Sequence, residues 1–367
     1  MKKVGIITLN GYINYGNRLQ NYALQEVLRD LGFSVETIIV DNSNLHTSNN
    51  LKKAFIFIKN ILYKSKKMII DRKSSQYKDK RIRKFKDFSN DYISETTYTI
   101  SNNKINKEVE KFDYFVVGSD QVWNPYYNNR SPIYFLEFAP KKKRIAYAPS
   151  FGIDTIPYEY SESYKRWIQQ IEHISVREDA GAIIIKQLTG RDAPVLVDPT
   201  LLLTKEKWIN ISKQAQNKPK IKYLLTYFLG GVPGQYKQQV QEIAKENNLE
   251  IVNLGDINDI ETYMADPSEF IDFINDCSIF CTDSFHGVVF SILLEKPFVV
   301  YERVGSASMY SRITTLLDKF DLNTRKAEFV NSKDIFDIDF SNIPEVLEKE
   351  RNKSFAYLKH ALGVKDE

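Results

Sequence analysis

The sequence predicts an α/β protein with two facing domains, each built on a parallel sheet. Apolar runs typical of buried strands alternate with helical patterns, once from residue 3 to about 200 and again from about 220 onward. The chain has 367 residues, 43% of them hydrophobic, which is too long for one small core and too apolar for a disordered chain. We therefore expect a first domain over 1–204, a second domain with a terminal helix over 205–367, and ligands in the cleft between them.

The first domain opens with an apolar run at 3–9, a polar loop and a helical pattern that Gly32 ends. The next apolar run, 33–39, is the second strand. A strand, a helix and a strand in this order predict a parallel pair joined by a right-handed crossover. Further strands are expected at 113–117, 144–148, 173–176 and 194–197, and helices around 161–171 and 178–189.

The second domain repeats this alternation, beginning with a strand at 221–228, a turn at 230–231 and a helix near 235–247. Further strands are expected at 249–254, 278–282 and 298–301, and helices at 267–276, from about 287, at 310–320 and at 343–362. Cys277 and Cys281 lie four residues apart with no second pair that could complete a zinc site. Both cysteines are therefore expected in the core.

A basic stretch interrupts the first domain. Residues 51–90 carry 14 lysines or arginines and only 3 aspartates, although the net charge of the whole chain is only +4. A basic helix with an apolar face can lie on an anionic membrane, whereas a solvated helical insertion is the alternative. Because no apolar segment is long enough to span a bilayer and the N-terminus lacks a signal-peptide core, we expect a cytoplasmic protein that this stretch could bring to the inner membrane face.

Four strand-to-helix turns carry polar side chains where open α/β sheets bind ligands. The first turn, from Gly11 to Asn17, has the glycine spacing of a phosphate-binding loop. However, Asn17-Arg18 replaces the Lys-Ser/Thr pair that reaches phosphate and magnesium, and the Gly-x-Gly-x-x-Gly dinucleotide fingerprint is absent. Kinase and nicotinamide-dependent functions lose their main support, and the turn is either a structural turn or a ligand loop.

The second turn follows the apolar run 113–117 and is dense in hydrogen-bonding groups. Carboxylate and amide side chains bind vicinal sugar hydroxyls in pairs, and an aromatic face stacks on a pyranose ring. The turn therefore suits a sugar, although a turn of capping residues beside a core tryptophan is the alternative. Its polar and aromatic residues are Ser119, Asp120, Gln121, Trp123 and Asn124.

The third and fourth turns suit anions and proton transfer. Arg177 ends a strand just before a helix, where a guanidinium can bind a carboxylate or phosphate with two hydrogen bonds. An ordinary ion pair with Glu178 or Asp198 is the alternative. His286 lies between an apolar strand and a helix, where an imidazole can exchange a proton beside a bound anion, or can simply cap the helix.

Five segments together resemble the polysaccharide pyruvyl transferase family in order and spacing, over roughly residues 1–325. They are 16–17, 118–124, 175–178, 197–199 and 283–287. The resemblance implies a GT-B-like pair of Rossmann-like domains. It also implies phosphoenolpyruvate as the donor of a pyruvate ketal to a sugar of a bacterial surface polysaccharide or of its lipid-linked precursor.

The resemblance also implies roles for particular residues. Arg177 matches the family's donor-binding arginine, and His286 matches its donor-contacting, catalytic histidine. One departure is that Ser284 stands where family members commonly carry an arginine, so that Arg303 or Arg312 supplies the missing charge or the donor differs. The expected donor group is Arg177, Ser284, Gly287, Arg303 and Arg312, and the expected acceptor group is Asn17, Ser119, Asp120, Gln121, Trp123 and Asn124. We expect no metal and no other cofactor, because no cluster of carboxylates or histidines suits one.

Two other functions share the expected fold, and the fold alone does not separate them. A GT-B glycosyltransferase would use a nucleotide sugar, for which Asp256 and Glu261 are weak candidates as the ribose-binding acid. A glycan-binding protein with a lapsed site follows if Ser284 leaves the donor pocket one charge short.

Overall fold

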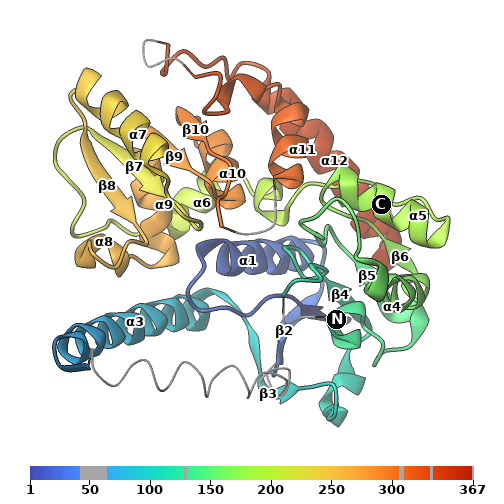
Figure 1. The fold of residues 1–367 in the computed structure, drawn as a ribbon. Coiled ribbons are helices and arrows are strands. Elements are labelled where there is room, and N and C mark those ends of the chain that lie inside the picture. The colour runs from blue at the N-terminus through green and yellow to red at the C-terminus, as the bar shows by residue number, and fades with distance from the viewer. Residues whose placement is uncertain (42–63, 128–129, 306–309, 331–333, 366–367) are drawn as a thin grey trace.

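The protein contains two parallel sheets, as the alternating sequence pattern predicts (Figure 1). The computed structural model describes residues 1–41, 64–127, 130–305, 310–330 and 334–365, with side chains from residue 75 onward in the second of these ranges. The first sheet has six strands in the order β3-β2-β1-β4-β5-β6, and the second has four in the order β10-β9-β7-β8. The α/β class with two parallel sheets is therefore confirmed.

The first sheet and its helices come from the first 200 residues. The strands are β1 (Lys3–Ile7), β2 (Ser34–Val40), β3 (Glu95–Ile100), β4 (Tyr114–Val117), β5 (Arg144–Ala146) and β6 (His173–Ile174). The helices are α1 (Tyr15–Asp30), α3 (Lys64–Tyr92), α4 (Tyr158–Gln169) and α5 (Asp179–Thr189), followed by the short 3-10 helix η5 (Pro199–Leu202). The expected strand at 194–197 is reduced to one parallel bridge between Val195 and Val176.

The second sheet repeats the arrangement with fewer strands. Its strands are β7 (Tyr223–Tyr227), β8 (Glu250–Leu254), β9 (Ile279–Thr282) and β10 (Phe298–Val300). The helices are α6 (Lys205–Ile211), α7 (Gly234–Glu246), α8 (Ile260–Tyr263), α9 (Pro267–Asp276), α10 (Phe285–Leu293), α11 (Ser311–Phe320) and α12 (Ile343–Leu362). Cys277 and Cys281 are buried in the core, as expected.

The terminal helix α12 runs back to the first half of the chain (Figure 1). Tyr357 donates a hydrogen bond to the carbonyl of Ala146 in β5 at 2.9 Å, and the Arg351 guanidinium donates to the carbonyl of Leu201 in η5 at 2.7 Å. Helix α12 thus contacts both strand β5 of the first half and the connection between the halves. The expected domain boundary between residues 204 and 205 stays a prediction.

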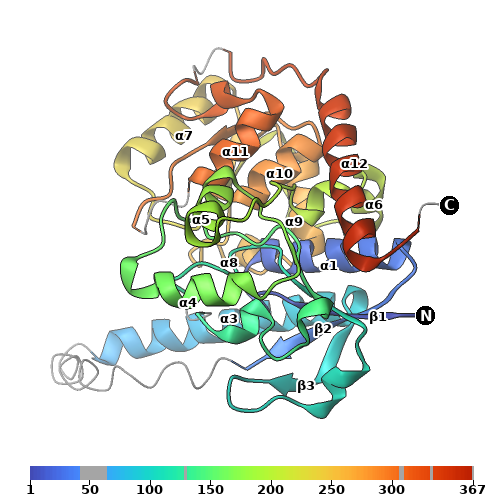
Figure 2. The same ribbon diagram turned by 90° about the vertical axis from the view of Figure 1, so that its right-hand side faces the viewer.

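Helix α1 lies between the two halves and is buried on all sides of its first three turns (Figures 1 and 2). Tyr15 stacks on Phe270 of α9 with ring centroids 4.3 Å apart, and its hydroxyl donates to the carbonyl of Ala265. Arg18 is fully buried and forms an ion pair with Glu95 at 2.7 Å. The Asn17-Arg18 step therefore gives Arg18 a structural role.

Helix α3 forms the second part of the expected basic insertion, whereas residues 51–63 lie outside the described residues. Arg81 of α3 is buried and donates to Tyr15, to the carbonyl of Ile13 and to the carbonyl of Tyr263. This helix is therefore fixed to both halves of the molecule. Among the described helices, none is long and apolar enough to cross a membrane.

Candidate active site

A cavity of about 320 Å³ lies where the two sheets reverse their strand order. In the first sheet the order reverses between β1 and β4, and in the second between β7 and β9. Loops that leave adjacent strands in opposite directions open a crevice at such switch points, where open α/β sheets bind ligands. The cavity is lined by Leu9, Gly11, Ile13, Asn14, Asn17, Asp120, Gln121, Tyr127, Leu229, Ser284, Phe285, His286, Arg303 and Arg312.

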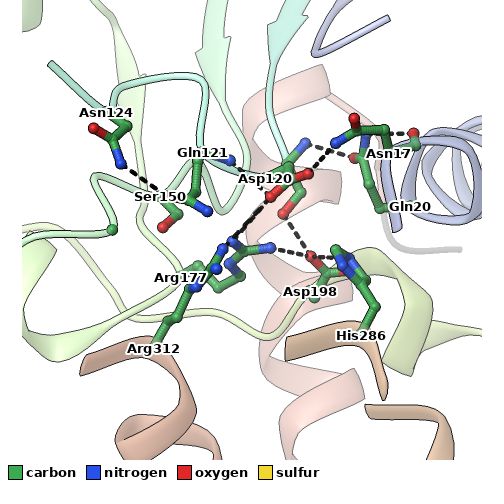
Figure 3. Close-up of polar contacts among 12 residues, drawn as sticks. Asn17, Gln20, Asp120, Gln121, Asn124, Ser150, Arg177, Asp198, His286 and Arg312 are labelled. Atoms are coloured by element: carbon green, nitrogen blue, oxygen red, sulfur yellow. Dashed lines mark hydrogen bonds and ion pairs between the residues drawn. The ribbon is translucent and has the colours of Figure 1, made fainter. Parts of the chain in front are cut away.

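Asp120 carries the negative charge of the first half's wall. Its carboxylate accepts hydrogen bonds from Asn17 and from Arg177, the latter at 3.3 Å, and Arg312 lies 3.8 Å away (Figure 3). Burial alone would raise the pKa of Asp120, but Arg177 chiefly holds it below its usual range. The backbone of Asp120 is left-handed, with φ 63°, a conformation that aspartate adopts more readily than most non-glycine residues. Asp120 is therefore a fixed carboxylate at the cavity edge.

Asp198 is the central acceptor of the network, although the sequence indicated it only as a possible partner of Arg177 and as part of the segment 197–199. One carboxylate oxygen accepts from Arg177 at 2.7 Å and from Ser119 at 2.9 Å, and lies 3.5 Å from Nε2 of His286 (Figure 3). The other oxygen accepts from the backbone and hydroxyl of Thr200. Burial alone would raise the pKa of Asp198, but His286 and Arg177 hold it well below its usual range.

His286 is held between helices from the two halves. It lies in the first turn of α10 and is 5% exposed, with Nε2 toward Asp198. On its other side lies Gly16 in the first turn of α1, where an added Cβ would be only 2.0 Å from Nδ1 of the ring. Only glycine at position 16 leaves room for the imidazole, so the orientation of His286 depends on Gly16 and Asp198 together.

Arg177 does not line the cavity. Its side chain is 1% exposed, lies 4.3 Å from the centroid of the Phe285 ring, and is paired with Asp198 and Asp120. The alternative of an ion pair with Asp198 is thus what the structure contains. The carboxylate of Asp198 also lies between Arg177 and His286, the two residues that the resemblance assigns to the donor.

Arg303 and Arg312 bring the positive charge of the second half into the cavity. The Nε of Arg303 lies 3.4 Å from the carboxylate of Asp283, and another of its nitrogens donates to the Asp283 carbonyl. Arg312 is 4% exposed. With the Gln121 amide turned so that its oxygen faces Arg312, the two terminal guanidinium nitrogens donate to that oxygen at 2.6 and 2.9 Å. Burial, with Arg177 nearby, lowers the pKa of Arg312 to about 10, so Arg312 stays a cation at neutral pH.

Ser284 and Gly287, the other two expected donor residues, are tied to the start of α10. The Ser284 hydroxyl accepts from the backbone N–H of Gly287 at 3.3 Å and so caps the helix. Ser284 lines the cavity, but Gly287 does not, and a Cβ at 287 would lie 2.9 Å from the Thr282 hydroxyl. Gly287 is therefore a packing residue whose N–H is already used.

Asn17, Asp120 and Gln121 of the expected acceptor group line the cavity, but the other three do not. Trp123 is fully buried and stacks on Phe135 with ring centroids 5.3 Å apart. Its indole N–H donates to the carbonyl of Tyr134. The expectation that Trp123 stacks on a sugar is therefore wrong, because both of its faces belong to the core. Ser119 and Asn124 are likewise buried, as supports of Asp198 and Gln121.

The described residues contain no cluster of three or more histidine, cysteine or acidic side chains that could hold a metal ion. The chemistry available at the cavity is therefore an imidazole beside a buried carboxylate, two guanidinium groups, and amide and carboxylate acceptors on the facing wall. Such a set can bind an anion and move a proton next to it.

Comparison with known proteins gives a family and a fold. A sequence model of the polysaccharide pyruvyl transferase family matches residues 14–303, and no curated protein matches the chain. The solved structures similar to this one include a putative UDP-N-acetylglucosamine 2-epimerase from Listeria monocytogenes, at 11% identity and a TM-score of 0.53, covering 100% of this chain and 98% of that one. The S. aureus MnaA–UDP co-structure has 13% identity and a TM-score of 0.50, with coverage of 100% and 98%. These similarities show a GT-B-like fold.

Proposed function

Because the chain belongs to the polysaccharide pyruvyl transferase family, we propose that it moves pyruvate from phosphoenolpyruvate to a sugar of a bacterial surface polysaccharide or of its lipid-linked precursor. The observation that supports this most is the single cavity at both switch points, where His286, Arg303 and Arg312 face Asn17, Asp120 and Gln121. An anionic donor suits the side with His286, Arg303 and Arg312. A polyhydroxylated acceptor suits the facing side with Asn17, Asp120 and Gln121.

The proposed reaction needs an acid before it needs a nucleophile. Protonated His286 gives its proton to C3 of phosphoenolpyruvate, which makes C2 an oxocarbenium-like centre. One sugar hydroxyl then attacks C2 and gives its proton to the now neutral His286. The second hydroxyl attacks C2 as the C2–O bond to phosphate breaks, and its proton leaves with the phosphate. Asp198, 3.5 Å from Nε2, stabilises the charged imidazolium from which the first proton comes.

The donor's phosphate and carboxylate are expected against Arg303 and Arg312. Both guanidinium groups line the cavity. Arg177 is not among the lining residues, and it is paired with the carboxylates of Asp120 and Asp198. In this arrangement Arg177 acts through Asp120 and Asp198, which it holds in place. Arg303 and Arg312 would also supply the charge that Ser284 does not.

Asn17, Asp120 and Gln121 are the expected contacts of the acceptor sugar. The basic stretch is expected to bring the enzyme to an anionic membrane surface, where a lipid-linked acceptor would be found. Both assignments are proposals that follow from the proposed reaction.

Thermal unfolding with ligands tests the donor. Phosphoenolpyruvate is expected to raise the Tm of the wild-type protein, and UDP-N-acetylglucosamine or UDP-glucose is not. Arg303→Ala and Arg312→Ala should each reduce the shift, whereas Arg83→Ala, an exposed arginine on α3, should leave it unchanged. A wild-type protein that ignores phosphoenolpyruvate, or variants that respond as fully as wild type, would contradict the assignment.

The same experiment separates the other two functions. A nucleotide-sugar glycosyltransferase, whose fold this chain shares, should respond to the nucleotide sugars and not to phosphoenolpyruvate. A glycan-binding protein with a lapsed site should respond to neither of these donors and should still bind glycan.

A further inference from the structure

A second cavity, of about 360 Å³, lies in the second half of the protein, between α7 and the chain that follows β10. Its volume falls within the roughly 300–1,000 Å³ typical of small-molecule sites. One wall is a face of α7, and the other is formed by Val300, Glu302, Tyr310 and residues 326–328. It is lined by Gln235, Tyr236, Gln239, Val300, Glu302, Tyr310, Lys326, Ala327 and Glu328.

Four polar side chains of this cavity have no partner among the described residues, whereas the Gln239 amide donates to the carbonyl of Ala327. Glu302 and Glu328 make no ion pair or hydrogen bond with any described residue, and neither do the hydroxyls of Tyr236 and Tyr310. The first cavity, at the switch points of the two sheets, is called the donor cavity below. It differs from the second cavity because the carboxylates and arginines around it are paired with one another. The second cavity therefore presents acceptors and donors that are free to bind a ligand.

Two aromatic rings and two carboxylates line this cavity together. The ring centroids of Tyr236 and Tyr301 lie 4.8 Å apart, and this contact fixes the Tyr236 ring on the α7 wall. The Lys326 ammonium lies 6.0 Å from the centroid of the Tyr310 ring. Burial and then the charges of Glu302 and Glu328 raise the pKa of Tyr236, in agreement with carboxylates that face the ring. Carboxylates beside aromatic rings are the groups that bind vicinal hydroxyls and pack on a pyranose.

The charge balance selects among possible ligands. The lining holds two glutamates and one lysine, so it is net negative and disfavours a phosphate-bearing ligand. A neutral sugar meets no such cost. The two cavities are also neighbours along the chain, because Glu302 lines the second cavity and Arg303 the donor cavity. The two sites are therefore lined by consecutive residues of this segment.

We propose that the second cavity binds a neutral sugar unit of the acceptor glycan, next to the unit that receives pyruvate. This proposal rests on the proposed function for the identity of the acceptor, but its central claim is sugar binding, which requires neither donor nor turnover. Glu302 and Glu328 accept hydrogen bonds from the hydroxyls, and the rings of Tyr236 and Tyr310 pack on the pyranose.

Saturation-transfer NMR tests this claim with free D-glucose, D-galactose, D-mannose, N-acetylglucosamine and N-acetylmannosamine, and with UMP as a separate probe. The wild-type protein should transfer saturation to the ring protons of at least one sugar without phosphoenolpyruvate. Glu302→Ala/Glu328→Ala should weaken that sugar's affinity by about tenfold or more, since one hydrogen bond to a charged group contributes about 1.5–3 kcal/mol. Both residues are exposed, so the fold should survive, which the Tm checks.

Glu246→Ala/Glu250→Ala removes two exposed carboxylates elsewhere in the same half and should leave sugar binding unchanged. Transfer to no sugar, or equal transfer to wild type and the Glu302/Glu328 variant, would overturn the proposal. A UMP signal that only the Glu302/Glu328 variant loses would assign the cavity to a nucleoside instead. A protein that binds sugar here but ignores phosphoenolpyruvate would contradict the proposed donor alone.

Discussion

Replacing Gly16 with alanine should disable His286 while leaving the protein folded. The new methyl group would lie 2.0 Å from Nδ1 of His286, 2.6 Å from Cγ and 2.7 Å from Cε1, whereas ordinary contacts begin at 3.4 Å. The ring must therefore move by about 1.4 Å, and Asp198 lies 3.5 Å away on its other side. Misplacing a catalytic group by about 1 Å can cost on the order of 10²-fold in rate.

Stability should change much less than turnover in this variant. Overpacking a buried site costs roughly 1–3 kcal/mol, and replacing a helical glycine with alanine offsets up to about 1 kcal/mol of that. The net loss should be about 0–3 kcal/mol, a shift of a few degrees in Tm for a protein of this size. Gly234→Ala in the first turn of α7 is the matched control, because nothing lies within 4 Å of its added methyl group.

Two measurements check this prediction. The first is phosphate release from phosphoenolpyruvate with a glycan acceptor, which should fall by about 10²-fold in Gly16→Ala and not at all in Gly234→Ala. The second is the imidazole nitrogen NMR spectrum, in which the His286 signals should shift and those of the other three histidines should not. Wild-type turnover with an unchanged His286 signal would refute the claim that Gly16 positions the ring.

Four further perturbations follow from the same network. His286→Gln should lower turnover by about 10²-fold or more while donor affinity changes less, and near wild-type turnover would leave His286 a structural residue. Arg177→Ala should abolish stabilisation by phosphoenolpyruvate, because the freed carboxylates of Asp120 and Asp198 would pair with the donor-site arginines; an unchanged thermal response would make Arg177 purely structural. Asp198→Asn should cost about 3–5 kcal/mol at neutral pH. Because the folded-state pKa of Asp198 is lowered, its contribution is complete above the unfolded value of about 3.9 and is lost as pH falls through the folded value, so wild type and variant should converge in acid in pH-dependent unfolding. Flotation with anionic vesicles should recover the protein in a salt-sensitive manner through the basic stretch, and equal recovery with neutral vesicles would favour a solvated insertion.

The site was predictable in part, because strand ends and turn chemistry are local. The loops at Asn17, Asp120 and His286 were identified from apolar runs that end in polar turns, and all three residues line one cavity. Asp198 gave only a weak signal, since an Asp-Pro step in a sequence is an ordinary helix cap. Its role arises from Arg177, Ser119 and His286, which lie far from it in the chain.

Edge and core positions were the harder part of the fold. Strand β3 was missed because Glu95-Thr-Thr-Tyr-Thr-Ile is polar and pairs on one side only, with β2. Trp123 was misassigned because an aromatic residue in a polar turn looks the same whether it faces solvent or the core. Its neighbours Phe135 and Tyr164 come from later segments, and only their arrival buries it.

The two parallel sheets, the helices between them and the turns that carry polar residues could be predicted from local patterns, because periodicity and turn chemistry depend on neighbours a few residues apart. Which polar groups meet depends on how the chain packs. Gly16 of the first half and His286 of the second come into contact because α1 is enclosed between both halves. Burial then decided which charges pair with each other, as Arg177 does with Asp198, and which face an open cavity, as Glu302 and Glu328 do. Burial and long-range pairing depend on residues that are distant in the chain, and for that reason no local pattern contains them.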